Sequence, residues 1–260
     1  MRLRLLLGLL CCLAGVAHAA PASTTPQKAY LSLIIDDLGQ NLPRDRRVLA
    51  LPGPVTAAIM PDTPHATEFA REAHRAGKIV ILHMPMAPAT GPFAWHPDLP
   101  IDELEKRLNA AFKVVPYTAG INNHMGSRMT SQRPAMAWLM ADLQRRHKLF
   151  VDSRTSAQTV AAAEAQKIGL ASVSRDVFLD DEPTEAAIFT QLQTAISLAR
   201  KQGSAVMIGH PYPQTLAVLE RELPKLKAQG IDWIDIKQMI SVRGNRATAA
   251  HGKDGNYRLP

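Results

Sequence analysis

The sequence predicts an α/β fold: a single (β/α) barrel of about seven strands, closed or nearly closed. Short apolar runs alternate with helix-like segments at close spacing between residues 30 and 240, which is typical of parallel strands joined by helices. No long stretch rich in Pro, Gly or Ser interrupts this pattern, so we predict one domain over residues 30–242. The alternative is an open, doubly wound sheet, which usually carries a glycine-rich phosphate loop after its first strand. The segment Asp36-Asp37-Leu-Gly39 is not such a loop.

The elements follow from local patterns. Helix-like segments begin at acidic residues or proline and end near glycine. Apolar, β-branched runs between them predict strands. The predicted helices are 65–75, 101–112, 134–147 and 183–202, and the predicted strands are 31–35, 55–60, 78–82, 119–122, 149–151, 170–173, 205–208 and 231–236.

The two ends of the chain differ from its centre. Residues 1–19 combine a basic start, a short apolar segment and an Ala-x-Ala end, which is typical of a secretory signal peptide and too short for a good membrane span. We therefore expect a periplasmic, soluble protein with a linker at 20–29. Both cysteines, Cys11 and Cys12, fall in the signal, so the processed chain would have none. Residues 243–260 are basic and rich in Gly and Asn, and we expect a disordered tail there.

The composition and charge also indicate which classes of binding partner to expect. The formal net charge is +7, and part of this surplus lies in the tail. A basic exported protein would be attracted to anionic polymers of the cell envelope. Aromatic residues are few and no nucleic-acid-binding motif is present, so we expect no nucleic-acid partner.

The first predicted strand ends in two adjacent carboxylates, Asp36 and Asp37, followed at once by Leu38 and Gly39. Neighbouring residues of a strand point to opposite faces, and like charges this close repel, so a buried strand gains no stability by ending in this way. One explanation is an ordinary solvated turn, since Asp and Gly are common turn residues. The other is a functional site in which a cation separates the roles of the two carboxylates.

Histidines recur at the same kind of position. Three of the nine, His83, His124 and His210, come immediately after apolar runs. The C-terminal ends of parallel barrel strands share one rim, where active sites are built. A single histidine at a strand end is more often a packed polar residue than a ligand, but three together with carboxylates predict a divalent metal such as Zn²⁺. Two histidines and one aspartate would leave a position open for water.

Six short blocks then stand in order along the chain: Ile35-Asp36-Asp37-Leu-Gly39, Leu82-His83-Met-Pro85-Met, Gly120-Ile-Asn-Asn123-His124-Met-Gly126-Ser127-Arg128, Val151-Asp152-Ser153-Arg-Thr155, Phe178-Leu-Asp180-Asp181 and Ile208-Gly209-His210-Pro211. In these blocks the sequence resembles the divergent polysaccharide deacetylases, bacterial envelope proteins distantly related to the carbohydrate esterases with the chitooligosaccharide-deacetylase barrel. The resemblance implies a deacetylase-like (β/α) barrel acting on an N-acetylated envelope glycan such as peptidoglycan.

The resemblance also implies roles. By similarity to the wider deacetylases, Asp36 is the catalytic base and Asp37 a metal ligand. Those enzymes take both metal histidines from one His-x-x-x-His turn, which is missing after His83. We therefore expect His124, from the next strand, to complete the ligand set. His210 resembles the histidine that acts as general acid, protonating the leaving amine while Asp36 takes a proton from the attacking water.

Four further polar residues are predicted to contact the substrate or to support the ligands: Asn123, Arg128, Asp152 and Asp180. Each also has a structural explanation. Asn123 could cap the following segment, and Arg128 could pair with Asp152 or Asp180. Asp152 is expected to orient a histidine or an arginine at the rim. The run Asp180-Asp181-Glu182-Pro183 could simply begin a helix, where acidic residues are favoured.

Two other functions stay open at this stage. The missing His-x-x-x-His turn would suit a non-catalytic barrel that binds a glycan or an envelope protein through a degenerate site. A metal-free glycosidase could use Asp36 with Asp152 or Asp180 as its carboxylate pair, although the histidines argue against it.

Overall fold

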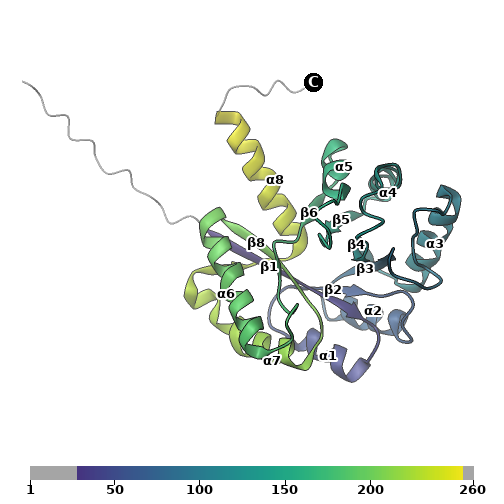
Figure 1. The fold of residues 1–260 in the computed structure, drawn as a ribbon. Helices are drawn as coiled ribbons and strands as arrows, with labels where there is room; N and C mark the ends of the chain where they lie inside the picture. The colour runs from purple at the N-terminus through teal and green to yellow at the C-terminus, as the bar shows by residue number, and fades with distance from the viewer. Residues whose placement is uncertain (1–27, 254–260) are drawn as a thin grey trace, which may run out of the picture.

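In a computed structural model, which describes residues 28–253 and side chains as far as residue 244, a curled parallel sheet lies between flanking helices (Figure 1). Its strands are β1 (Ala29–Leu38), β2 (Val55–Ile59), β3 (Ile79–Met86), β4 (Thr118–Met125), β5 (Leu149–Asp152), β6 (Ser172–Ser174), β7 (Val177–Phe178), β8 (Ser204–Gly209) and β9 (Ile231–Trp233). The helices are α1 (Leu42–Ala50), α2 (Ala66–Arg75), α3 (Ile101–Val114), α4 (Arg133–Arg145), α5 (Ala161–Lys167), α6 (Glu185–Gln202), α7 (Pro213–Glu222) and α8 (Ile236–Lys253).

The sheet has the strand order β6-β5-β4-β3-β2-β1-β8-β7, and every pair of neighbours is parallel. The short strand β9 lies outside this path and pairs with the beginning of β1. The edge strands β6 and β7 follow one another in the chain, and no pairing joins them within the described residues. The fold is therefore an incompletely closed (β/α) barrel, which confirms the predicted fold class.

The strand alternation divides the apolar residues between two cores. The larger core lies between the outer face of the sheet and the helices and contains Leu33, Leu82 and Phe150. The smaller one fills the inside of the barrel with residues of the opposite alternation, such as Ile34, Ile81 and Ile208. The first turns of α8 close its floor, because Ile236 and Met239 are fully buried against these strands.

The ends of the chain are only partly described. The predicted signal peptide and the linker up to residue 27 lie outside the described residues, as do residues 254–260. The predicted tail differs from the structure in its start, because α8 continues through residue 253. Its run Arg-Ala-Thr-Ala-Ala contains strong helix formers, which the Gly and Asn residues around it obscured. Within the described residues, every helix is too short or too polar to span a bilayer.

The sequence analysis predicted no helix for α1, α5, α7 and α8. The first three have ten residues or fewer, so their periodic patterns are weak. The first of them, α1, packs directly after the strand that carries Asp36 and Asp37. Its Asp45 is buried and accepts hydrogen bonds from the backbone N–H of Gly39 (2.9 Å) and of Asn41 (3.2 Å), which fixes the turn behind the two carboxylates.

Candidate metal centre

The polar rim lies directly above the inner core, because three of its members are the next inward-facing positions after apolar core residues. Asp36 follows Ile34 by two positions on β1, His83 follows Ile81 on β3, and His210, one residue past the end of β8, follows Ile208. The register between β3 and β4 pairs His83 with Asn122 and Pro85 with His124, so Asn122 and His124 face the same interior.

Asp37 reaches this rim through an irregularity in β1. The pairing of β1 with β2 changes register between Ile35 and Leu38, and Asp37 has φ 56°, in the left-handed region. A bulge of this kind re-aims a side chain that regular alternation would send to the other face. The chain then turns at Gly39, where an added Cβ would lie 2.3 Å from Oγ1 of Thr63. Glycine is therefore required at the end of this strand.

Three donor atoms converge at the centre of the rim, from Asp37, His83 and His124. Oδ1 of Asp37 lies 3.3 Å from Nε2 of His83 and 3.1 Å from Nδ1 of His124, and the two ring nitrogens are 3.1 Å apart. Ligand atoms about 2 Å from a tetrahedral zinc ion lie about 3.3 Å from one another. The spacing and chemistry of the three donors therefore fit a divalent metal.

The carboxylate of Asp37 gives an independent test of this fit. Its Oδ1 is buried and accepts no hydrogen bond of normal geometry, although two ring nitrogens lie within 3.3 Å of it. Such an orphaned acceptor facing two nitrogens is expected where all three point at a common ion. Burial alone would raise the pKa of Asp37, but the neighbouring rings and charges of His124 and His83 hold it well below its usual range.

Asn122 organises the buried side of the centre. Its Oδ1 lies 2.8 Å from Nδ1 of His83, and its Nδ2 donates to Oδ1 of Asp36 at 2.9 Å and to Oγ of Ser153 at 3.3 Å. Because an amide oxygen only accepts, Nδ1 of His83 must carry the proton in this contact. Nε2 is then free to bind a metal when the ring is neutral, as outer partners of metal-binding histidines commonly ensure.

Asp36 lies beside the donors without joining them. It is 2 % exposed, and its Oδ2 is 3.6 Å from Nε2 of His83. Burial is the main reason that the pKa of Asp36 is raised, and the charge of Asp37 adds to it. The charges of His83 and His210 and the hydrogen bond from Asn122 oppose this rise. A carboxylate with a raised pKa next to a metal site has the properties of a general base.

His210 and Asp180 form a second unit across the rim. Oδ1 of Asp180 lies 2.9 Å from Nδ1 of His210, while its Oδ2 accepts from the backbone N–H of His210 at 2.6 Å and from Oγ1 of Thr215 at 2.7 Å. Burial would lower the pKa of His210, but the bond and charge of Asp180 and the charges of Asp36 and Asp37 raise it to about 9. Nε2 of His210 is 3.9 Å from Oδ2 of Asp37, so the ring faces the centre.

The remaining predicted residues lie around the centre rather than in it. Asn123 ties two loops together, since its Nδ2 donates to the carbonyl of Met125 (2.7 Å) and its Oδ1 accepts from the N–H of Ser153 (3.0 Å). Asp152 orients neither a histidine nor an arginine side chain. It accepts from the N–H of Arg154 and from Oγ1 of Thr159, and so shapes the loop after β5. Its strand position explains this, because Val151 faces the interior and Asp152 therefore faces away.

The other two predicted residues have opposite outcomes. The guanidinium of Arg128 pairs with neither Asp152 nor Asp180 in the described structure, and it contacts none of the three donors. Asp180 does support a rim residue, because it holds His210. The alternative in which Asp180 only begins a helix is wrong, since α6 starts at Glu185 with Thr184 as its cap.

Two cavities flank the three donors. One, of about 180 Å³, is lined by Asp36, His83, His124, Phe178 and His210 among others. The other, of about 260 Å³, lies on the far side of Asp37 and His124 and is lined also by Arg44 and Tyr212. Tyr212 stacks on the ring of His210 with 5.4 Å between centroids and is 38 % exposed, so it presents a flat face to the second cavity.

Sequence reasoning missed Asn122, Ser153 and Thr215. The alternation of side chains along a strand predicts Asn122, because Asn122 lies two residues before His124 and must share the face of that histidine. The same rule places Ser153 two residues after the interior Val151. Thr215 gives no such signal, because it lies on α7 and meets Asp180 only through the tertiary fold.

Comparison with known proteins places most of the chain in one family. Residues 33–240 match the family described as divergent polysaccharide deacetylase. The chain is 43% identical over 195 residues to the uncharacterized protein YibQ of Escherichia coli K12, an alignment that covers 74% of this chain and 61% of that protein. The chain thus spans less than two thirds of the length of that relative.

Solved structures share the fold. An uncharacterized protein from Agrobacterium tumefaciens C58 superimposes with a TM-score of 0.78 at 23% identity, covering 83% of this chain and 91% of that one. A protein from Bacillus anthracis described as a CE4 family pseudoenzyme superimposes with a TM-score of 0.54 at 16% identity, covering 83% of this chain and 66% of that one. At these identities the likeness concerns the fold alone.

Proposed function

The chain belongs to the divergent polysaccharide deacetylase family, and from this premise we propose that it is a metal-dependent hydrolase that removes acetyl groups from an envelope polysaccharide such as peptidoglycan. The observation that carries the proposal is the convergence of Asp37, His83 and His124 between a buried carboxylate and a histidine of raised pKa. We propose Zn²⁺ as the metal, because one carboxylate and two imidazoles suit it. The sequence of residues 1–19 supports the periplasm as the location.

In this proposal Asp37, His83 and His124 hold the ion. A bound divalent ion would polarise the acetyl carbonyl and lower the pKa of a water molecule. Asn122 fixes the tautomer of His83 through its bond to Nδ1, so that Nε2 is presented as a lone pair. The family resemblance implies Asp37 as a ligand, His124 is our inference in place of the missing His-x-x-x-His turn, and the distances on the rim support the set.

Proton transfer is assigned to the residues on either side. Asp36, buried and held by Nδ2 of Asn122, accepts the proton of the attacking water. His210 carries a proton near neutral pH because Asp180 holds its Nδ1, and its Nε2 faces the centre. It is placed to protonate the amine that leaves when the amide bond breaks. The base and the acid thus come from β1 and from the end of β8, which are hydrogen-bonded neighbours in the sheet.

The flanking cavities suit the two parts of an acetylated sugar. The smaller cavity, about 180 Å³, is lined by Asp36, His210 and Phe178 and would take the acetyl group. The larger one, about 260 Å³, opens beside Asp37 and would take the sugar ring, with Tyr212 as a stacking face. This division would bring the carbonyl between the donor atoms and Asp36.

The decisive experiment is acetate release from N-acetylated glycans by zinc-loaded protein. We expect wild type to release acetate, and Asp36→Ala to lose activity by about a hundredfold or more. Asp98→Ala, which changes an exposed aspartate in the loop before α3, is the matched control and should keep full activity. Equal activity in wild type and Asp36→Ala would overturn the assignment of the base.

A second candidate is a barrel that binds a glycan without turning it over. The observation in its favour is that the same fold occurs in a protein described as a pseudoenzyme. It would be supported if the zinc-loaded wild type released no acetate from a broad glycan panel yet bound one of those glycans, with the binding lost in Tyr212→Ala.

A further inference from the structure

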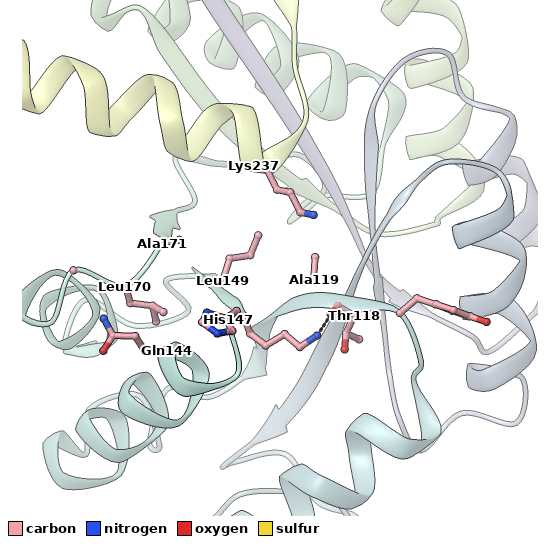
Figure 2. A pocket seen from close by; sticks show the side chains of 11 residues that line it. Thr118, Ala119, Gln144, His147, Leu149, Leu170, Ala171 and Lys237 are labelled. Carbon is pink, nitrogen blue, oxygen red and sulfur yellow. Dashed lines mark hydrogen bonds between the residues drawn. The ribbon is translucent and has the colours of Figure 1, made fainter.

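A third and larger cavity lies at the other end of the strands from the metal centre. Its volume is about 620 Å³, and it opens where β4 and β5 begin, at Thr118 and Leu149. Lys237, in the first turn of α8, reaches over it from one side, and Gln144 and His147 border it from the end of α4 (Figure 2). No residue lines both this cavity and either of the two beside the metal centre.

The polar lining of this cavity carries positive charge only. Lys148 and Lys237 contribute ammonium groups, and no aspartate or glutamate is among the lining residues. Nζ of Lys148 donates to the backbone carbonyl of Thr118, while Lys237 forms no ion pair with any residue whose side chain is described. Burial, the largest effect, and the charges of Lys237 and Arg146 together lower the pKa of Lys148. Two cations thus face one cavity without a counter-charge in its lining.

Backbone strain marks the same place. Five non-glycine residues of the described chain have positive φ, and three of them, Asp37, Met125 and Arg154, lie at the catalytic rim. The other two, Tyr117 (φ 64°) and His147 (φ 54°), both line this cavity. The comparable turn after α2 uses Gly77 instead. Left-handed backbone costs a residue with a side chain roughly 1–2 kcal/mol, and such strain clusters at functional sites.

From this cavity, its unopposed cations and its two strained lining residues, we propose that it binds a small organic anion. A phosphate or carboxylate would lie between Lys148 and Lys237, where charge-assisted hydrogen bonds are strongest. The apolar part would pack on Leu149 and Leu170, which line the cavity beside Ala119 and Ala171. Tyr117, whose ring stacks on His74 at 4.1 Å between centroids, would form one wall.

Isothermal titration calorimetry with inorganic phosphate, n-hexyl phosphate and hexanoate tests the proposal, with n-hexanol as the neutral control. We expect wild type to bind hexyl phosphate or hexanoate at millimolar concentration or below, more tightly than inorganic phosphate, and not to bind hexanol. Lys237→Ala should weaken binding about tenfold or more. Lys237 is exposed, so this variant is expected to fold. Lys201→Ala, an exposed lysine on α6, is the matched control and should bind as wild type does.

A rim variant separates this site from the metal centre. His124→Ala should bind the anions as wild type does, because His124 lines the two cavities beside the metal centre and not this one. The proposal is overturned if wild type binds none of the three anions, if Lys237→Ala binds as tightly as wild type, or if binding disappears in His124→Ala and persists in Lys237→Ala.

Discussion

Nδ1 of His83 lies 2.8 Å from Oδ1 of Asn122, and the same amide donates to Asp36 through its nitrogen. One buried asparagine thus touches both a predicted metal ligand and the predicted base. Because the amide group has one accepting and one donating end, it fixes the protonated nitrogen of the histidine and the accepting oxygen of the carboxylate together. The orientation of both residues therefore depends on a side chain that is not one of the three donors.

Replacing this amide should weaken metal binding. In Asn122→Ala we expect zinc affinity to fall about 10- to 100-fold, the usual effect of removing an outer partner of a metal-binding histidine. Titration of metal-free protein with Zn²⁺ measures it. Asn109→Ala, on the partly exposed side of α3, is the control and should bind zinc as wild type does. Unchanged affinity in Asn122→Ala would mean that His83 needs no partner to bind.

The pH dependence of activity should follow His210. This residue must be protonated to donate, so activity should fall on the alkaline side as the pH passes its pKa, which is raised to about 9. Asp180→Asn removes the charge that does most to raise the pKa of His210, so the alkaline limb of the kcat/KM profile should move toward lower pH. Thr215→Val removes a neutral hydrogen bond to Asp180 and should shift the limb less. An unmoved limb in Asp180→Asn would exclude His210 as the titrating acid.

Metal binding itself should release protons. Burial would lower the pKa of His83, but the charges of Asp36 and Asp37, the close contact with Asp37 and the hydrogen bond to Asn122 raise it above its ordinary value. A ligand must be neutral to bind, so zinc affinity should weaken as the pH falls through this raised pKa. Calorimetry in buffers of different ionisation enthalpy counts the released protons. Asp36→Asn removes the charge that raises the pKa of His83 most, so this variant should release fewer protons when zinc binds. Equal proton release in both proteins would contradict this account.

Backbone strain at His147 should be measurable as stability. With φ 54° at the end of α4, this residue occupies a conformation that suits glycine. We expect His147→Gly to increase the free energy of unfolding by about 1 kcal/mol, and Gly169→Ala, at φ 70° with open space around it, to decrease it by about 1 kcal/mol. Urea denaturation measures both. A decrease in His147→Gly would show that the imidazole contributes more by its contacts than its backbone costs.

Much of this architecture follows from local patterns, because the strands are strongly apolar and lie between recognisable helices. The barrel could therefore be predicted. The group Asp37, His83 and His124 was predicted from the family resemblance and from the absence of the His-x-x-x-His turn, not from local patterns. What could not be predicted are features that depend on register. The bulge at Asp37 breaks the alternation that sequence reasoning assumes, and the position of Thr215 depends on where α7 packs. The sequence predicts Asn123 as a site residue, whereas strand alternation places its neighbour Asn122 on the inward face.

The strand that carries both carboxylates is completed only by the last part of the domain. β1 begins at residue 29, yet it pairs with β8 and β9, and the floor beneath it is filled by Ile236 and Met239 of α8. These contacts join residues separated by most of the chain, and such high contact order slows folding because long loops must close first. A nascent chain that ends before β9 lacks both the strand that pairs with the start of β1 and the floor from α8, so these supports of the two carboxylates would form only after synthesis of the whole domain.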